Sequence, residues 1–305
     1  MHIIVSKGGI AMLPYAPEGA FLSTPTMEAL YRGKELGDIF QAICIKCDEY
    51  HDLHVDLGCC KGIIPREEAA LGIPEGTTSE YTILSRVGKP VCFQVMDFDA
   101  NGNAILSRRS AQADAKNYFM NCLRSGDIVP AVVQNPTEFG VFCDIGCGVT
   151  AMMRIDRCCI SRLKSTTDHF YVGQKIYAAI YAIDDETGYI HLTGRELLGT
   201  WEENIRDFRQ GQTVSGIVRS VMPYGSFVEL APNLSGLAEP MIGVQEGDAV
   251  SVYIRAIQQD RHKIKLNILQ VLPKAPARQR LPYRLTEGRI SKWEYYPGST
   301  AVTYF

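Results

Sequence analysis

The sequence lacks any hydrophobic run long enough to cross a bilayer, which takes roughly 18 consecutive apolar residues. Its first residues, MHIIVSKGGIAMLPY, also lack the basic start, long apolar core and cleavage site of a secretory signal. We therefore expect a cytoplasmic protein that has no membrane partner. At 305 residues, the chain is expected to form two or three domains.

The usual catalytic motifs are missing as well. The sequence contains no G-x-S-x-G, P-loop, HExxH or glycine-rich dinucleotide turn, and its six histidines are scattered. We therefore expect no catalytic residues and no enzymatic activity. A cysteine with a distant histidine stays open as a nucleophile pair, because no local signature selects one.

All ten cysteines lie within the first 159 residues of the chain. A secreted protein of this size would spread a disulfide framework over all its domains. A zinc site would have to join Cys44 and Cys47 to the adjacent pair Cys59 and Cys60, whose side chains diverge. We expect buried thiols, no metal and no cofactor, and keep a redox or zinc protein as the weakest alternative.

An internal repeat is the most informative feature of the sequence. With a shift of 85 positions, residues 126–154 align with residues 211–239 without a gap. Residues 173–193 align with residues 247–267 at an offset of 74, so the later copy lacks 11 residues between its halves. We call these the second and third copies, because a degenerate first copy precedes them.

The first copy begins at Gly37 and needs a one-residue insertion between Tyr50 and His54 to align with the others. Each copy contains about five short alternating stretches separated by turn residues, which predicts a small closed barrel. The expected interior positions are Ile128, Val132 and Ile145 in the second copy and Val214, Val218 and Leu230 in the third.

Short helices are expected to join the copies. Apolar residues recur at helical spacing over residues 110–123 and 195–208, and Gly126 and Gly211 follow as stop signals. A further helix is expected to begin at Thr24-Pro25 and to end before Gly37.

The third copy carries the family resemblance. GQTVSGIVRSVMPYGSFVELAPNLSGLAE, residues 211–239, has the pattern G-x-x-V-x-G-x-V, then aromatic-Gly-x-Phe-Val, then G-L. The chain resembles tandem S1-type RNA-binding domains, as in bacterial ribosomal protein S1, over roughly residues 37–270. The linker GTWEENIRDFRQG is similar to the tryptophan-bearing helix that joins the repeats of that family.

The resemblance implies a mainly β fold of three tandem five-stranded OB-type barrels joined by short helices, with RNA as ligand. The expected organisation is an extension with a short helix (1–36), a degenerate barrel (37–112), a helical linker (113–125), a barrel (126–196), a helical linker (197–210), a barrel (211–270) and a basic aromatic tail (271–305).

Two aromatic pairs, Phe139 with Phe142 and Tyr224 with Phe227, recur at matched positions of the repeat. Bases of single-stranded RNA stack on such rings. Residues three apart on a regular strand point to opposite faces, but the glycine within each pair can open a turn or bulge that turns both rings outward. The alternative is that one ring of each pair belongs to the core.

The family's binding face also has a histidine in the third strand and an aspartate and arginine four residues apart. In the second copy Asp185 matches the aspartate, and Arg154 and Tyr189 stand in the histidine and arginine positions. In the third copy Lys263, with Lys265 two residues further on, serves for the arginine, whereas Gln259 replaces the aspartate and Glu239 replaces the histidine. The first copy has Tyr50, His51 and His54 where the aromatics belong, and Pro65 in the histidine position.

Charge supports RNA binding only in part. The net charge is −4 over residues 37–112, −3 over 126–196, 0 over 211–270 and +4 over 271–305, which leaves −3 for the chain. Affinity must therefore depend on stacking and local patches. The basic tail interleaves aromatic and cationic residues and is a possible second RNA site, or a strand packed on the third barrel. Its candidate residues are Arg278, Arg280, Arg284, Lys292 and Trp293.

We therefore expect a non-catalytic protein that holds single-stranded RNA on tandem barrels in translation or RNA turnover, with the ribosome or RNA-processing proteins as further partners. The rival interpretation is a protein-interaction scaffold. Its barrels would bind the ribosome, a nuclease or a polymerase, with the acidic first copy as the contact surface.

Overall fold

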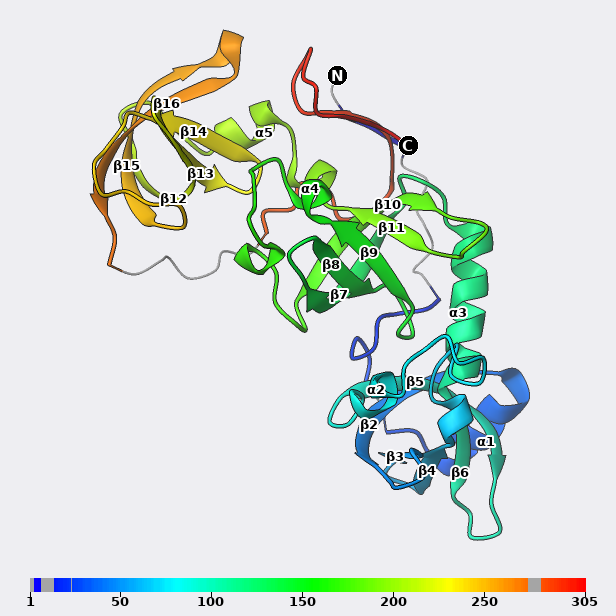
Figure 1. The fold of residues 1–305 in the computed structure, drawn as a ribbon. Helices are drawn as coiled ribbons and strands as arrows, with labels where there is room; N and C mark the ends of the chain where they lie inside the picture. Colours follow the sequence, from blue (N-terminus) through cyan, green and yellow to red (C-terminus); the bar gives the residue numbers. More distant parts are fainter. Residues whose placement is uncertain (1–2, 7–13, 23, 274–280) are drawn as a thin grey trace. The chain divides into compact units, whose positions relative to one another are not determined.

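The structure is a computed structural model that describes residues 3–6, 14–22, 24–273 and 281–305. The strands of these residues form three closed five-stranded barrels and a three-stranded sheet (Figure 1). The fold is therefore mainly β, with three tandem OB-type barrels, as the sequence predicts.

All three barrels share one topology, in which the first strand pairs with the second and fourth, and the third pairs with the fifth in parallel. The first barrel consists of β2 (Ile39–Cys47), β3 (Leu53–Asp56), β4 (Lys61–Ile64), β5 (Pro90–Phe98) and β6 (Ala104–Ser107). The second consists of β7 (Ile128–Pro136), β8 (Gly140–Asp144), β9 (Thr150–Arg154), β10 (Lys175–Ile183) and β11 (Ile190–Thr193). The third consists of β12 (Thr213–Met222), β13 (Gly225–Ala231), β14 (Leu234–Ala238), β15 (Ala249–Gln258) and β16 (Lys263–Val271).

The interior of each barrel follows the period-two pattern, but two of the expected interior residues are wrong. Ile128 and Val132 lie on the outer face of β7, whereas Val133, which aligns with the fully buried Val218, faces inward. The half-buried Val214 packs against the core of the third barrel, as expected. The outer face of β7 is also partly covered, because Ile128 packs in a cluster that includes Ile290. Because β7 carries apolar residues on both faces, its sequence does not reveal which alternate residues point into the barrel.

The first two expected helices form close to their predicted positions. Helix α1 (Met27–Leu36) begins after Thr26, whose hydroxyl accepts a hydrogen bond from the Ala29 N–H, and it ends at Gly37. Helix α3 (Arg108–Cys122) follows the first barrel directly, with Ser107 as its N-cap.

The predicted helix over residues 195–208 is wrong in its continuity. It is divided into a 3₁₀ turn, η3 (Arg195–Leu198), and a short helix, α5 (Trp201–Ile205). Gly199 separates them with a φ of +86°, which a helix cannot contain. Thr200 and Glu203 then form a capping box that starts α5 afresh.

The barrels differ mainly in what connects their third and fourth strands. The first barrel carries η1 (Arg66–Glu68) and α2 (Tyr81–Leu84) there, and the second carries α4 (Ile155–Cys158) and η2 (Thr166–Asp168). The third barrel has a short loop, which accounts for the 11 residues it lacks. Its own 3₁₀ turn, η4 (Gln259–Arg261), joins β15 to β16.

The end of the chain folds into a sheet. Strand β17 (Arg289–Glu294) pairs with β18 (Val302–Tyr304) on one side and with β1 (Ile3–Ser6) on the other. Arg289 forms an ion pair with the buried Asp127 at 2.5 Å, where the second barrel begins. The C-terminal residues are therefore an ordered part of the unit that contains the second and third barrels.

Two compact units make up the chain. One contains residues 1–11, 124–143 and 151–305, and hence the strands of the second and third barrels with the C-terminal sheet. The other contains residues 12–123 and 144–150, and hence the first barrel with α1 and α3.

Candidate nucleic-acid interface

Phe139 and Phe142 form an outward-facing pair on the second barrel. Phe139 lies in the turn between β7 and β8 and is 58% exposed, while Phe142 lies on β8 and is half-buried. Their ring centroids are 6.0 Å apart and their planes are nearly perpendicular, at 84°. The turn between the strands, rather than a bulge, is what releases both rings from the alternation of a single strand.

Tyr224 and Phe227 take the same places on the third barrel, and they are 62% and 37% exposed. The glycine after each turn permits a close approach to the third strand. A Cβ on Gly225 would lie 2.2 Å from the Ala238 carbonyl oxygen, and one on Gly140 would lie 2.7 Å from the Met153 carbonyl oxygen. Glycine at both positions therefore lets the turn that carries the first ring lie against the barrel.

On the third barrel, strand register places Phe227 in a row with a cation. Phe227 pairs with Leu237 on β14, and Leu237 pairs with Lys265 on β16. Leu237 is half-buried and Lys265 is exposed, so the row lies on the outer face. We call Phe227, Leu237 and Lys265 the third-barrel row. An aromatic ring, an aliphatic side chain and an ammonium group in line can stack a base and contact a phosphate.

The second barrel has a corresponding row that the sequence interpretation missed. Met152 on β9 pairs with His191 on β11, and β8, which carries Phe142, is the other neighbour of β9. We call Phe142, Met152 and His191 the second-barrel row. The repeat offsets of 85 and 74 align these residues with Phe227, Leu237 and Lys265, so the repeat itself held the signal.

The remaining candidates of the second barrel do not all meet. Arg154 is exposed beside the Phe139 turn, because the next residue, Ile155, donates its N–H to the Phe139 carbonyl at 2.9 Å. Asp185 and the 67% exposed Tyr189 lie at the β10–β11 turn. Since β9 and β11 are parallel, Tyr189 and Arg154 lie about four residues, or roughly 13 Å, apart along the ladder.

Asp184, next to Asp185, organises that turn. Its carboxylate accepts the N–H groups of Glu186 at 3.0 Å and Thr187 at 3.1 Å. Hydrogen bonds from Thr187 lower the pKa of Asp184, so its charge belongs to the turn.

On the third barrel, Lys263 and Lys265 are both exposed and point outward from β16. Glu239, in the histidine position, is an acid that would repel a phosphate. It forms a close ion pair with Arg255 on β15, which compensates its charge. Because Arg255 offsets the charge of Glu239, this carboxylate does not oppose RNA binding on this face.

The first barrel confirms the predicted insertion, because five residues separate the paired Cys47 and Leu53 whereas four separate the paired Val221 and Ser226. In this longer turn the imidazole of His51 lies 3.1 Å from the Glu80 carboxylate.

The C-terminal candidates are held within the fold. Trp293 is fully buried in the core cluster, so the expectation that it contacts RNA is wrong: a ring with no exposed face cannot stack on a base. Arg284 pairs with Asp207, and the Lys292 ammonium lies 3.8 Å from Glu294 and 5.4 Å from the centre of the Tyr304 ring. Arg278 and Arg280 lie outside the described residues.

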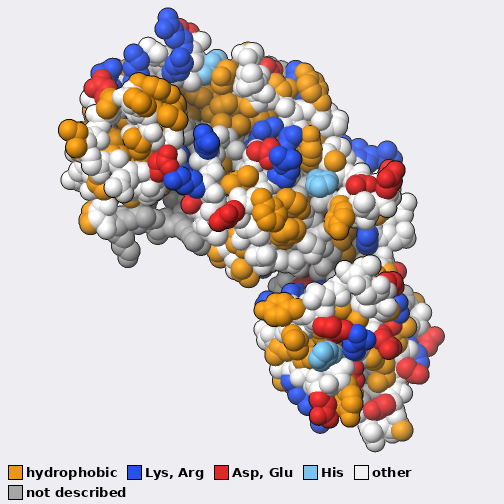
Figure 2. Space-filling model, viewed as in Figure 1, with side chains coloured by type: hydrophobic (Ala, Val, Ile, Leu, Met, Phe, Trp, Pro, Cys, Tyr) orange, Lys and Arg blue, Asp and Glu red, His pale blue; other side chains and the backbone are white. Residues whose placement is uncertain are grey.

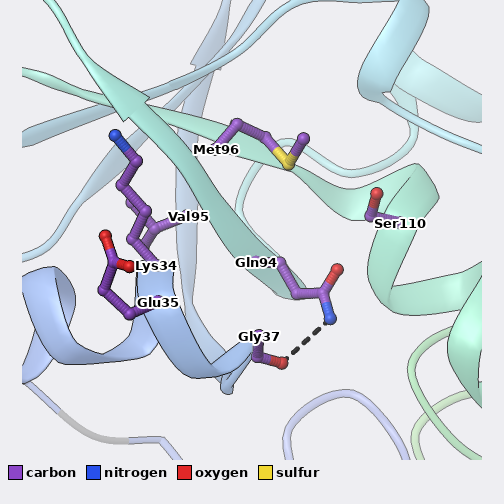
Figure 3. Close-up of a pocket in the computed structure, with 7 residues that line it drawn as sticks. All are labelled: Lys34, Glu35, Gly37, Gln94, Val95, Met96 and Ser110. Atoms are coloured by element: carbon purple, nitrogen blue, oxygen red, sulfur yellow. Dashed lines mark hydrogen bonds between the residues drawn. The ribbon is translucent and has the colours of Figure 1, made fainter.

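A surface hollow of about 380 Å³ lies on the other unit, lined by residues of α1, β5 and α3 (Figure 3). Two of its polar side chains already have partners, since Lys34 is paired with Asp97 at 2.8 Å and the Gln94 amide donates to the Gly37 carbonyl at 2.9 Å. We assign this hollow no ligand.

The cysteines show no sign of a metal centre within the part of the chain that is described, where no three His, Cys, Asp or Glu side chains gather as ligands. Burial raises the pKa of the Cys44 thiol to about 11, which opposes thiolate chemistry. None of the described helices is long and apolar enough to span a membrane.

Comparison with known proteins identifies the second barrel. The family model described as "S1 RNA binding domain" matches residues 123–195. The second barrel is thus similar to S1 RNA-binding domains. The match begins at Leu123, directly after α3, and ends just after β11, so it covers all five strands of that barrel.

Similar proteins are ribosomal. The small ribosomal subunit protein bS1 of Staphylococcus aureus (strain COL) is 29% identical over 203 residues, covering 61% of this chain and 52% of the relative. The bS1 homolog of Bacillus subtilis (strain 168) is 27% identical over 279 residues, covering 85% of this chain and 71% of the relative. The chain thus spans about half the length of the staphylococcal relatives it matches.

Among solved structures, a multidomain protein with nucleic acid binding domains from Streptococcus pneumoniae is 17% identical and covers 76% of this chain and 73% of that one. Its TM-score is 0.27, so this likeness adds nothing to the sequence matches.

Proposed function

We propose that this protein binds single-stranded RNA on the second-barrel and third-barrel rows, together with the neighbouring rings Phe139 and Tyr224, without catalysing a reaction. The observation that carries the proposal is the recurrence of an exposed aromatic pair, at matched positions of two barrels, in a chain whose second barrel is similar to S1 RNA-binding domains. Each stacked base is worth about 1–3 kcal/mol.

The second and third barrels have net charges of −3 and 0, so electrostatic attraction contributes little beyond the local cations. Stacking then supplies most of the affinity. Two modest faces on one chain also reinforce each other, because binding by the first raises the effective RNA concentration at the second.

The relatives named small ribosomal subunit protein bS1 support a role in translation, with the ribosome as a partner and the cytoplasm as its place. The further binding candidates are Arg154, Asp185, Tyr189 and Lys263, and beyond the barrels Arg284 and Lys292, with Arg278 and Arg280 in the undescribed segment.

Fluorescence anisotropy with a labelled mixed-sequence 20-mer RNA tests the proposal. A variant with alanine at Phe139, Phe142, Tyr224 and Phe227, here called the four-alanine variant, should bind at least tenfold more weakly while keeping its circular dichroism spectrum. A control with alanine at Phe21 and Tyr31, which are 65% and 52% exposed on the other unit, should bind like the wild type. Failure of the wild type to bind the RNA would overturn the proposal and favour the scaffold.

A further inference from the structure

The first barrel places basic side chains where the other barrels carry their aromatic rows. His54 on β3 pairs with Lys46, the residue after the bulge of β2, and with Ile63 on β4. Phe227 has the same two relations on the third barrel, to the residue after the β12 bulge and to the third strand. His54 is therefore the structural equivalent of Phe227.

Two more basic side chains border the same face. His51 lies in the β2–β3 turn, the equivalent of the Tyr224 turn, and has a φ of +66°. Arg66 follows β4, and its N–H donates to the Asp52 carboxylate of that turn at 2.8 Å. Ile155 makes the matching contact to the Phe139 turn in the second barrel. The positions that the aromatic pair occupies elsewhere are thus taken by His51 and His54 and bordered by Lys46 and Arg66.

Carboxylates of the same chain already bind these basic side chains. Glu80 accepts from Arg66 with one oxygen and lies 3.1 Å from His51 Nδ1 with the other, while Asp48 lies 2.7 Å from His54 Nε2. The hydrogen bond from Arg66 lowers the pKa of Glu80, which keeps it ionised. Figure 2 shows a histidine bordered by basic and acidic side chains on the visible face of this barrel.

The Glu80 carboxylate can move away from Arg66 and His51 without disturbing the barrel strands. Its side chain is 39% exposed, and it precedes α2 without making a side-chain capping bond. It belongs to the connection between β4 and β5, for which the third barrel has only a short loop. Two carboxylate oxygens bridging a guanidinium and an imidazole occupy the positions that two phosphate oxygens would take.

We propose that His51, His54 and Arg66 form a third phosphate-binding site for single-stranded RNA, which Glu80 occupies in the free protein. The inference rests on the proposed function, because it assumes that RNA follows the same outer face on each barrel. A phosphate of the strand replaces the Glu80 carboxylate on Arg66 and His51.

The test uses the full chain with the four alanines described above, so that the other two barrels contribute little. Adding Glu80→Ala should tighten binding of the labelled 20-mer about five- to tenfold, because Arg66 and His51 lose their internal partner. Adding Arg66→Ala to that variant should reverse the gain. Glu75→Ala is the matched control, since Glu75 is an exposed acid of the same connection.

Equal affinity of the Glu80→Ala and Glu75→Ala variants would overturn the inference, as would a gain that survives Arg66→Ala. Glu80→Gln, which keeps the side-chain shape, replaces Glu80→Ala if circular dichroism shows that the alanine variant is unfolded. The proposed function is judged separately, by comparing the wild type with the four-alanine variant.

Discussion

At the scale of single residues, stacking and charge are separable on the third-barrel row. Phe227 supplies a ring and Lys265 a cation two strands away, with Leu237 between them. The ring contributes an affinity that is nearly independent of salt, whereas the cation contributes through counterion release.

Phe227→Ala is therefore expected to weaken RNA binding roughly tenfold without changing the slope of log affinity against log salt concentration. Lys265→Ala is expected to weaken it only severalfold and to make that slope shallower by somewhat less than one. Anisotropy titrations at several salt concentrations measure both. The same slope change in both variants would mean that Phe227 does not act by stacking.

The hydrogen bonds that Glu229 accepts from His169 and Arg219 are expected to weaken in acid. Although burial opposes its charge, hydrogen bonds from His169 at 3.1 Å and Arg219 at 2.9 Å lower its pKa to about 2. Since the pKa in the folded state lies below the unfolded value near 4.5, the stabilisation is fully present above pH 4.5 and is lost as the pH falls towards 2.

This difference corresponds to about 3 kcal/mol. Urea unfolding should show that the wild type and Glu229→Gln differ less in their free energy of unfolding at pH 3 than at pH 6. A gap that does not depend on pH would contradict the assignment.

At the scale of elements, each aromatic turn depends on a glycine that lies against the third strand. Gly225→Ala places a methyl group 2.2 Å from a backbone oxygen, at a φ of +147° that side chains disfavour. We expect a loss of about 1–3 kcal/mol in the free energy of unfolding, and weaker RNA binding by the third barrel.

Gly243→Ala is a matched control, because its φ is also positive, at +87°, but no atom lies within 4 Å of the added methyl group. Thermal unfolding of both variants separates the two effects, because Gly243→Ala introduces backbone strain alone and Gly225→Ala adds the close contact. Equal destabilisation would show that the approach of the turn to β14 is unimportant.

The sequence predicted the three barrels because the repeat supplied the same alternation three times. It failed where two signals compete. The spacing over residues 195–208 is helical, yet Gly199 and the Thr200–Glu203 capping box divide the segment. Trp293 looked like a binding residue among cations, but only tertiary packing shows that its ring lies in the core. The rows across strands depend on register, which a single strand does not reveal.

At the scale of the whole molecule, the C-terminal sheet belongs to the unit formed by the second and third barrels, and both tryptophans of the chain, Trp201 and Trp293, lie in that unit. Tryptophan fluorescence therefore reports on this unit alone, whereas far-ultraviolet circular dichroism reports on both units.

We expect the two signals to give different midpoints in urea, because each unit has its own core. Trp293→Ala should lower the free energy of unfolding of its unit by about 3–5 kcal/mol, as followed by circular dichroism. Backbone amide chemical shifts, measured by NMR during the urea titration, assign each transition to a unit. Coincident curves from all probes would contradict the division into two units.

If the proposed function holds, RNA lies across the rows of the second and third barrels. Ultraviolet crosslinking of the wild-type protein to a 20-mer containing 4-thiouridine, followed by mass spectrometry of the crosslinked peptides, locates the strand directly. We expect crosslinks in residues 137–154 and 222–239, which carry the aromatic turns and the third strands. Crosslinks confined to the first barrel or to the C-terminal sheet would contradict it.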